Sequence, residues 1–322
     1  MMMKFFAQII LSTVLLQMFP VDAADVQRLA TSSLKFGSSP SSYNAFSLPV
    51  SHLPIAQAAQ PGPVKIKPIS LGVVTSAVSA IVIDRKTKRI LFQKNIDASR
   101  SIGSITKLMT AYVFLETNPD LNALAKLESK DFRAGGVQHI AFGETVTVKD
   151  LLYASLISSD NSATASLMRL SGMSEVDFIA KMNETAEHIG MYHTLFVDST
   201  GLSPKNESVV EDIAKLLDIT SQNSIITEAT SNATYSVTSE SGKTYSLSST
   251  DELLDSFINQ NPYHVVVAKT GFLPEAGYCL GLLFSNANSG DIMVVVLGAE
   301  TNNDRFQDVK SLVVWTYETF KW

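Results

Sequence analysis

Segments rich in β-branched and aromatic residues lie at both ends of the region from residue 71 to residue 322, and apolar helical segments lie between them. Two such segments, 79–84 and 88–93, flank a polar turn and predict a hairpin. Three more strands are expected at 264–269, 278–284 and 292–297. This order indicates an α+β fold, with one antiparallel sheet of N- and C-terminal strands flanked by helices and a mostly helical inserted lobe.

The helical segments have recognisable starts and a strongly apolar character. Residues 106–116 are apolar on every side, which is typical of a buried helix. Thr147 and Asp150 have the spacing of a capping box, which predicts the start of another helix. A final helix is expected to begin at Asp304, with Gln307 three residues further on.

The first 23 residues have the features of a secretory signal peptide. Lys4 gives a positive start, 5–19 is an apolar stretch, and small residues precede a cleavage site after Ala23. A membrane anchor is the alternative, but about 15 mixed residues are fewer than the ~20 that a span needs. We expect a periplasmic or secreted protein with no integral membrane anchor after cleavage. Residues 24–70, rich in Ser, Pro and Ala, predict a leader or tether before one domain at 71–322.

The composition excludes several classes of partner. The formal net charge is −6 and the chain has no basic cluster, so nucleic acid is not expected to bind. No group of His, Cys, Asp and Glu has metal-ligand spacing, and we expect neither a metal nor a cofactor. Cys279, the only cysteine, lies in an apolar segment and is expected to be a buried thiol.

Three short motifs carry the chemistry: Ser104-Ile-Thr-Lys107, Ser159-Asp-Asn161 and Lys269-Thr-Gly271. Each is weak alone, since Ser32 and Lys35 also fit the first pattern. Their order and context, however, are those of penicillin-binding proteins and class A β-lactamases.

The first motif places a serine immediately before the apolar helical segment. Ser104 can be a simple helix N-cap, but Lys107 follows on the same face in an apolar setting. Burial favours neutral lysine, which is the base that a serine nucleophile needs. We therefore expect Ser104 as nucleophile, Lys107 as general base, and the Ser104 N–H as one donor of an oxyanion hole.

The second motif interrupts an otherwise regular helical stretch. It can be a turn that ends a helix, because Ser, Asp and Asn favour turns. In the functional interpretation, Ser159 relays a proton between Lys107 and the leaving amine. Asn161 would then hydrogen-bond the amide of the substrate.

The third motif ends the apolar segment 265–268. Its lysine can mark the exit of a strand into solvent, whereas its glycine permits close approach by a ligand. We expect Lys269 to add positive charge near the substrate, Thr270 to bind a carboxylate, and the Phe272 N–H to be the second oxyanion donor. Arg305 is either a surface residue or a bidentate clamp for a carboxylate. The expected substrate-binding residues are Asn161, Lys269, Thr270, Gly271 and Arg305.

From about residue 79 to residue 315 the chain resembles the low-molecular-mass penicillin-binding proteins, the serine D-Ala-D-Ala peptidases. The resemblance rests on 102–111, 191–202, 269–272 and the spacing from Lys269 to Arg305. It implies a β-lactamase/transpeptidase-like fold and an acyl-enzyme on Ser104. It also implies peptidoglycan stem peptides with D-Ala as substrates and β-lactam antibiotics as covalent inhibitors.

The chain departs from the family pattern at two places. Ser101 and Gly103 stand where Pro and Ala are usual, and Ser249-Thr-Asp251 stands where Asn-Thr-Asn is usual. The second departure is expected to alter the substrate cleft. The end of the chain soon after the last helix, with Lys-Thr-Gly-Phe272, resembles the penicillin-binding protein 7 type of D-alanyl-D-alanine endopeptidase. This resemblance favours endopeptidase over carboxypeptidase, although the same groups serve both reactions.

Two other functions fit part of the pattern. A class A β-lactamase needs a Glu-x-x-x-Asn motif roughly 36 residues after the second motif, and 194–202 contains no glutamate. A non-hydrolytic muropeptide or β-lactam receptor would keep the cleft and lose the chemistry. Every catalytic position is present here, so the sequence favours an enzyme.

Overall fold

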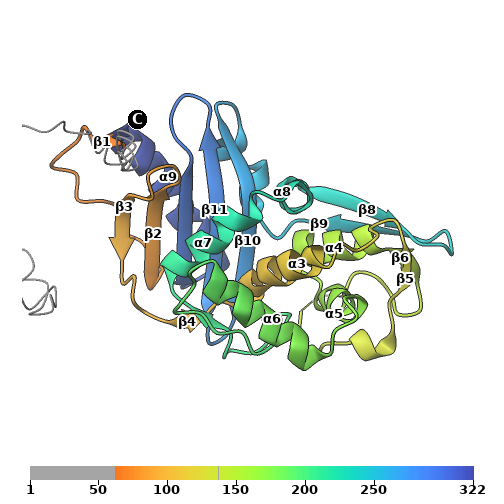
Figure 1. Cartoon of the computed structure of the whole chain (residues 1–322). Helices are drawn as coiled ribbons and strands as arrows, with labels where there is room; N and C mark the ends of the chain where they lie inside the picture. Colours follow the sequence, from red (N-terminus) through yellow and green to blue (C-terminus); the bar gives the residue numbers. More distant parts are fainter. Residues whose placement is uncertain (1–61, 137) are drawn as a thin grey trace, which may run out of the picture. The chain divides into compact units, whose positions relative to one another are not determined.

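A five-stranded antiparallel sheet in the order β10-β11-β12-β2-β3 forms the centre of the fold (Figure 1). The computed structural model describes residues 62–136 and 138–322, so the predicted signal peptide and most of the predicted leader lie outside the described residues. β12 pairs with β2 from Ile292↔Asp84 to Leu297↔Ser79 and thereby joins the two ends of the domain sequence. The strands of the sheet are β2 (Ser79–Asp84), β3 (Ile90–Lys94), β10 (Tyr263–Leu273), β11 (Gly277–Asn286) and β12 (Ile292–Ala299).

These strands confirm the predicted sheet and the α+β class, with one correction. The strand predicted to end at Lys269 continues to Leu273, so the Lys-Thr-Gly motif lies inside β10. The reason is pairing: β10 stays in register with β11 down to Leu273↔Gly277. Lys269 therefore does not mark the exit of a strand into solvent.

Alternate residues of the sheet face two separate cores. Ile81 and Val295 pack on the side of α7 (Val210–Thr220), whereas Val82 and Val294 pack on the side of α9 (Asn302–Thr319). Since side chains alternate across a strand, uninterrupted apolar strands are what a sheet covered on both faces requires. Figure 1 shows the two helices on opposite faces.

Helix α9 starts earlier than predicted. It begins at Asn302, two residues before the expected Asp304, and Thr301 is its N-cap. Thr301 Oγ1 accepts a hydrogen bond from Asp304 N at 3.1 Å. The expected start at Asp304, with Gln307 three residues further on, is therefore wrong, because Thr301 caps the helix one turn earlier.

The remaining helices form the lobe beside the sheet. Helix α3, which carries the first motif, has the predicted bounds and packs among the other lobe helices. The predicted capping box is confirmed: Thr147 Oγ1 accepts from Asp150 N, and Asp150 Oδ2 accepts from Thr147 N, each at 3.0 Å. The lobe helices are α3 (Thr106–Glu116), α4 (Val148–Ile157), α5 (Asn161–Leu170), α6 (Glu175–His188) and α8 (Ser224–Ser231).

Short strands and 3-10 turns complete the fold. The short strands pair as β1 with β13, β4 with β7, β5 with β6 and β8 with β9. These strands are β1 (Val64–Lys65), β4 (Arg100–Ser101), β5 (Leu124–Lys126), β6 (Thr145–Thr147), β7 (Glu207–Ser208), β8 (Thr234–Thr238), β9 (Thr244–Ser248) and β13 (Phe320–Lys321). The 3-10 turns are η1 (Gly103–Ile105), η2 (Ser129–Asp131), η3 (Glu252–Asp255) and η4 (Phe257–Asn259).

The first described residues, assigned to the leader by composition, contact the C-terminal helix. Ile66 N donates to Thr319 O at 2.8 Å, and Trp315 Nε1 donates to Ser70 Oγ at 2.7 Å. Across residues 62–136 and 138–322, the helices are all too short or too polar to cross a membrane.

Candidate active site

The three motifs come together at one cleft between the sheet and the helical lobe. Ser104 comes from η1, Ser159 and Asn161 from the start of α5 and the link before it, and Thr270 and Gly271 from β10. All of them line a cavity of about 420 Å³. Lys107 and Lys269 are buried behind its wall.

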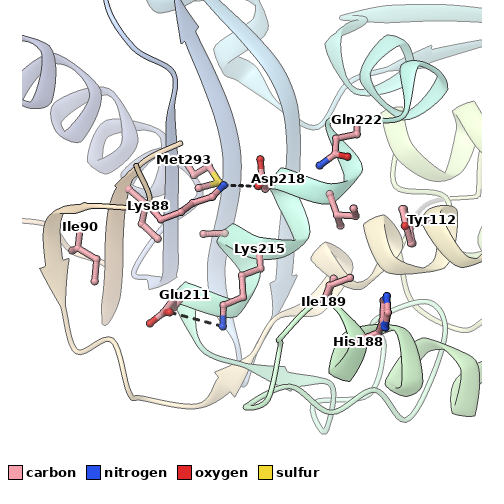
Figure 2. A pocket seen from close by; sticks show the side chains of 13 residues that line it. Lys88, Ile90, Tyr112, His188, Ile189, Glu211, Lys215, Asp218, Gln222 and Met293 are labelled. Carbon is pink, nitrogen blue, oxygen red and sulfur yellow. Dashed lines mark hydrogen bonds and ion pairs between the residues drawn. The ribbon is translucent and has the colours of Figure 1, made fainter. Parts of the chain in front are cut away.

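A larger cavity, of about 580 Å³, lies elsewhere (Figure 2). It lies beside the β2–β3 hairpin and α7, and none of the three motifs contributes to it. Its charged groups pair with one another, as Lys88 does with Asp218 at 2.5 Å and Lys215 with Glu211 at 3.8 Å. The motif cleft is therefore the candidate active site, because only it contains a nucleophile beside a base.

Lys107 is aimed at Ser104 from the first turn of α3. Its Nζ lies 2.9 Å from Ser104 Oγ and 2.6 Å from Asn161 Oδ1. The side chain is fully buried, and desolvation lowers its pKa from 10.5 to about 7, although Asp198 and Asp160 act in the opposite direction. A lysine with this pKa is partly neutral at pH 7 and can accept the proton of a hydroxyl group.

Ser104 does not cap the helix. It lies within η1, and neither η1 nor α3 has a side-chain hydrogen bond at its N-cap. The N-cap alternative for Ser104 is therefore wrong, and its hydroxyl group is free to react.

A third acceptor for Lys107 is the carbonyl oxygen of Thr200, 2.6 Å from Nζ. It belongs to a loop folded around Asp198, whose Oδ1 accepts from Thr200 N at 2.6 Å and from Gly201 N at 2.7 Å. Asp198 Oδ2 accepts from Ser203 N at 2.7 Å. The sequence does not reveal this contact, because every residue has a backbone carbonyl group and none is marked by its residue type. The turn-forming sequence Asp-Ser-Thr-Gly indicates only that a loop is present.

Ser159 lies in the left-handed region of the backbone, with φ of 60°. This conformation is costly for a residue other than glycine, and strained residues of this kind tend to cluster at functional sites. Ser159 Oγ accepts a hydrogen bond from Lys269 Nζ at 3.0 Å. Asp160 caps α5 through Ala163 N at 2.9 Å, so the second motif both starts a helix and places a serine in the cleft.

Asn161 connects the base to the far wall of the cleft. Its Oδ1 accepts from Lys107 and its Nδ2 donates to Gly135 O at 2.6 Å. One Nδ2 hydrogen is left for a ligand. Asn161 therefore fixes the position of Lys107 in addition to its predicted contact with the substrate.

Lys269 brings a second buried amine to the site. Only 1% of the residue is exposed, and Nζ donates to Ser159 Oγ and to Thr270 O, the latter at 3.2 Å. Desolvation holds its pKa well below 10.5, and the positive charges of Lys107 and Arg305 add to this effect. Ser159 thus lies beside an amine whose hold on its proton is weakened by burial.

The glycine of the third motif has a structural role in addition to the predicted contact with a ligand. A Cβ atom on Gly271 would lie 2.2 Å from the carbonyl oxygen of Ile102, much closer than real Cβ contacts allow. The close approach that the glycine permits is thus that of the protein's own backbone before Ser104. Close approach by a ligand at Gly271, which lines the cavity, stays a prediction.

This packing brings the two predicted oxyanion donors onto adjoining backbone. A Cβ atom on Gly103 would lie 2.8 Å from Phe272 N, and one on Gly201 would lie 3.0 Å from Ser104 N. Both donor residues line the cleft. Two backbone N–H groups at the wall of a cleft are what stabilisation of a developing oxyanion requires.

Arg305 reaches the cleft from α9 and is not a surface residue, since only 6% of it is exposed. Its Nη1 donates to Gly271 O at 3.2 Å and Cys279 O at 3.4 Å, and its Nη2 donates to Asn302 Oδ1. The guanidinium group is therefore already engaged on one side. It can offer a ligand its charge and one free Nη2 hydrogen. The predicted bidentate clamp would need two free N–H groups side by side, so the contact available here is weaker.

Thr250 is a cleft residue that sequence reasoning did not select. Its Oγ1 lies 2.6 Å from Thr270 Oγ1, and it lines the cavity. The signal was the departure from the family pattern at Ser249-Thr-Asp251. The two hydroxyl groups form one polar edge beside Arg305.

The cavity lining differs from the surrounding protein in its acidic groups. Among the described residues that line it, none is Asp or Glu. Across the same part of the chain, no group of three or more His, Cys, Asp and Glu could hold a metal ion. Cys279 is fully buried, as expected, and burial raises its pKa to about 11, so its thiol is unreactive.

Comparison with known proteins places this geometry in a family. The model of the S11 peptidase family, described as D-alanyl-D-alanine carboxypeptidase, matches residues 68–301. A D-alanyl-D-alanine endopeptidase from Pseudomonas aeruginosa is 32% identical over 241 residues, which are 74% of this chain and 76% of the relative.

Two solved structures are similar in fold. The DD-transpeptidase of Streptomyces K15 matches with a TM-score of 0.71 at 25% identity, over 77% of this chain and 100% of that protein. Penicillin-binding protein D2 of Listeria monocytogenes, solved in its ampicillin-bound form, matches with a TM-score of 0.66 at 30% identity, over 76% of this chain and 99% of that protein. Since the family model covers most of the chain and the motif residues meet at one cleft, the chain belongs to the S11 family of serine D-Ala-D-Ala peptidases.

Proposed function

We propose that this peptidase cleaves D-Ala-D-amino acid bonds of peptidoglycan peptides through an acyl-enzyme on Ser104. The observation that carries the assignment is the 2.9 Å contact between Ser104 Oγ and Lys107 Nζ, in a lysine whose pKa is about 7. A buried lysine with a lowered pKa beside a serine hydroxyl group is an activated nucleophile.

The acylation step follows from the positions of the groups. Neutral Lys107 takes the Ser104 proton as Oγ attacks the carbonyl carbon of the scissile amide. The N–H groups of Ser104 and Phe272 stabilise the oxyanion that forms. Ser159 passes its proton to the departing amine and is reprotonated by Lys107. The water that then attacks the ester gives a proton to Lys107, which returns one to Ser104 Oγ as the ester bond breaks.

The other end of the cleft binds the negative end of the substrate. Thr270 and Thr250 offer hydroxyl groups, Arg305 supplies positive charge, and Lys269 adds to it when its amine is protonated. Asn161 has one free Nδ2 hydrogen for the substrate amide. This arrangement suits a carboxylate next to the scissile bond, as in a peptide that ends in D-Ala.

Endopeptidase activity is the form of the reaction that we favour over carboxypeptidase activity. The relative from Pseudomonas aeruginosa that covers most of this chain is named a D-alanyl-D-alanine endopeptidase. The test offers the purified protein a pentapeptide muropeptide and a cross-linked dimer, and identifies the products by mass. Release of terminal D-Ala without cleavage of the dimer would assign carboxypeptidase activity instead.

β-Lactam antibiotics are expected to acylate the same serine. Penicillin-binding protein D2, which shares this fold, was solved with ampicillin bound. A class A β-lactamase is disfavoured because no acidic side chain lines the described part of the cleft to activate water against the ester.

Export is the remaining part of the proposal. The domain at 71–322 would act in the periplasm or outside the cell after the signal peptide is cleaved behind Ala23. The sequence of the first residues supports this, and the substrate lies outside the cytoplasm. Mass analysis of the N-terminus of the exported protein tests it, and a retained Met1 would contradict it.

A further inference from the structure

Asp251 carries a buried carboxylate beside the cationic end of the cleft. Only 5% of the residue is exposed, and Oδ1 accepts from Leu253 N at 3.0 Å. Oδ2 is buried and has no hydrogen-bond partner among residues 62–136 and 138–322. A buried carboxylate oxygen without a partner is costly and calls for a reason.

Two cations face this carboxylate from different elements: Arg305 from α9 and Lys269 from β10. Arg305 Nε is also buried and without a partner in the described part of the chain. Glu252, the next residue, is the nearby anion, and its Oε1 accepts from Asn302 Nδ2 at 2.8 Å. The charges of Asp251 and Arg305 therefore attract each other without a direct hydrogen bond.

The backbone links Asp251 directly to the cleft. Thr250, the preceding residue, lines the cavity and lies 2.6 Å from Thr270 through the two Oγ1 atoms. Thr250 N donates to Ile157 O at 3.1 Å, which fixes the segment to the end of α4. Asp251 thus lies behind Thr250 and Thr270, the groups that would bind a substrate carboxylate, and is separated by them from the cavity.

We propose that Asp251 is a positioning residue that competes with the substrate carboxylate for the positive charge of Lys269 and Arg305, so that carboxylate binding is coupled to proton uptake by Asp251. The inference rests on the proposed function, which places a carboxylate at Thr270. Two carboxylates around the same cations repel each other, so the arrival of one favours the neutral form of the other. Because coupling is reciprocal, protonation of Asp251 must strengthen carboxylate binding.

The direction of the pH dependence follows. Burial raises the pKa of Asp251 to about 6, against the opposing effects of the Leu253 N–H, Arg305 and Lys269. Below pH 6 Asp251 is neutral and the cations act on the substrate alone, whereas above pH 6 its charge offsets them. KM for a peptide with a free C-terminal carboxylate should therefore rise about three- to tenfold from pH 5 to pH 7.5, and KM for the amidated peptide should not.

Two other ionisable groups, Lys107 and Lys269, lie nearby, and the design separates them from Asp251. Lys107, with a pKa of about 7, acts on the nucleophile and affects both peptides alike. Lys269, like Asp251, lies at the end of the cleft that would bind the substrate carboxylate. The contribution of Asp251 to the pH dependence can therefore be separated from that of Lys269 only by replacing Asp251.

The test is Asp251→Asn, which keeps an oxygen for the Leu253 N–H and removes only the charge. At pH 7.5, KM for the free-carboxylate peptide should fall about three- to tenfold, to its pH 5 value, with kcat unchanged. Damage to the fold would raise KM for both peptides, so a selective gain separates this role from a structural one. Asp255→Asn is the matched control, since Asp255 lies on the same turn, η3, and is exposed.

Calorimetry measures the proton directly. The Ser104→Ala protein, mixed with the free-carboxylate peptide at pH 6.5 in buffers of different ionisation enthalpy, should take up a fraction of a proton. The double variant Ser104→Ala, Asp251→Asn should take up no proton from solution. The Ser104→Ala protein should also take up none when it binds the amidated peptide, and this second comparison is made with Asp251 intact.

The outcomes are distinct. If the Asp251→Asn protein still takes up a proton, or if its KM for the free-carboxylate peptide still rises between pH 5 and pH 7.5, the inference is overturned. The pH dependence would then be assigned to Lys269. Proton uptake with the amidated peptide would overturn the inference as well. Wild-type protein that neither cleaves the peptides nor forms an ester with penicillin would instead contradict the proposed function.

Discussion

Lys107 Nζ lies 2.6 Å from the carbonyl oxygen of Thr200. This contact holds the amine in place beside Ser104, but a carbonyl oxygen favours the charged form of lysine, which cannot act as a base. Burial favours the neutral form and lowers the pKa to about 7. The loop around Asp198 therefore orients the base while burial activates it.

The pH dependence of acylation should reveal this balance. Because neutral Lys107 is the active form, the rate of acylation by a fluorescent penicillin should rise about tenfold per pH unit below pH 7 and level off above it. Rates measured from pH 5.5 to pH 8.5 test this. A rate that does not change over this range would exclude Lys107 as the titrating base.

Replacement of the base should leave a folded but slow enzyme. Lys107→Ala should lower the acylation rate by about 10²- to 10⁴-fold, the usual contribution of general acid–base catalysis. Circular dichroism checks the fold, and Lys181→Ala, at a half-exposed lysine of α6 outside the cleft, is the control. Near-normal labelling of the Lys107 variant at pH 7 would disprove its role.

Gly271→Ala should separate β10 from the backbone before Ser104. The added Cβ atom would lie 2.2 Å from Ile102 O, so one of the two segments must move and the oxyanion donors lose their alignment. We expect penicillin labelling to fall by about 10²-fold or more, the cost of one lost donor. Gly242→Ala is the control: its φ of +83° strains the turn between β8 and β9, but the Cβ atom meets nothing within 4 Å, so penicillin labelling should be normal.

The charge of Arg305 should matter most for substrates with a free carboxylate. Arg305→Ala should cost about 1.5–3 kcal/mol of binding for such a peptide and less for its amide. Arg305→Lys keeps the charge without the contacts to Gly271 O and Cys279 O, and should restore part of the difference. Equal losses on both peptides would show that Arg305 only supports the fold.

Penicillin should form a long-lived ester on Ser104. Acylation needs Lys107, Ser159 and two backbone donors, whereas deacylation needs a second base, and no acidic side chain lines the described cleft. Intact-protein mass should show an increase equal to the whole drug for minutes to hours, and Ser104→Ala should abolish it. Turnover of several drug molecules per second without an adduct would identify a β-lactamase.

Local patterns predicted much of the fold and the reactive side chains. The strands at both ends, the helix 106–116 and the capping box at Thr147 depend on neighbouring residues and were confirmed. The reactive pair Ser104 and Lys107 shares one helical turn, so its geometry also follows from local spacing.

Contacts between distant segments could not be predicted in the same way. The Thr200 carbonyl is a backbone group brought to Lys107 by a loop, and no residue type marks it. The approach of Ile102 to Gly271 depends on how η1 packs against β10, which spacing within a motif does not specify. The end of β10 at Leu273 is set by its pairing with β11. The guanidinium group of Arg305 already donates hydrogen bonds to carbonyl groups of the sheet, a contact that the sequence does not reveal.

The order of the elements along the chain also limits when the enzyme can first act. Ser104 and Lys107 stand near the start of the domain, whereas Lys269 and the Phe272 N–H belong to β10, and Arg305 follows on α9. A chain that has been synthesised only as far as the helical lobe holds the serine and the lysine without the proposed oxyanion donors or the proposed carboxylate site. The proposed reaction therefore requires almost the whole domain to be present and folded.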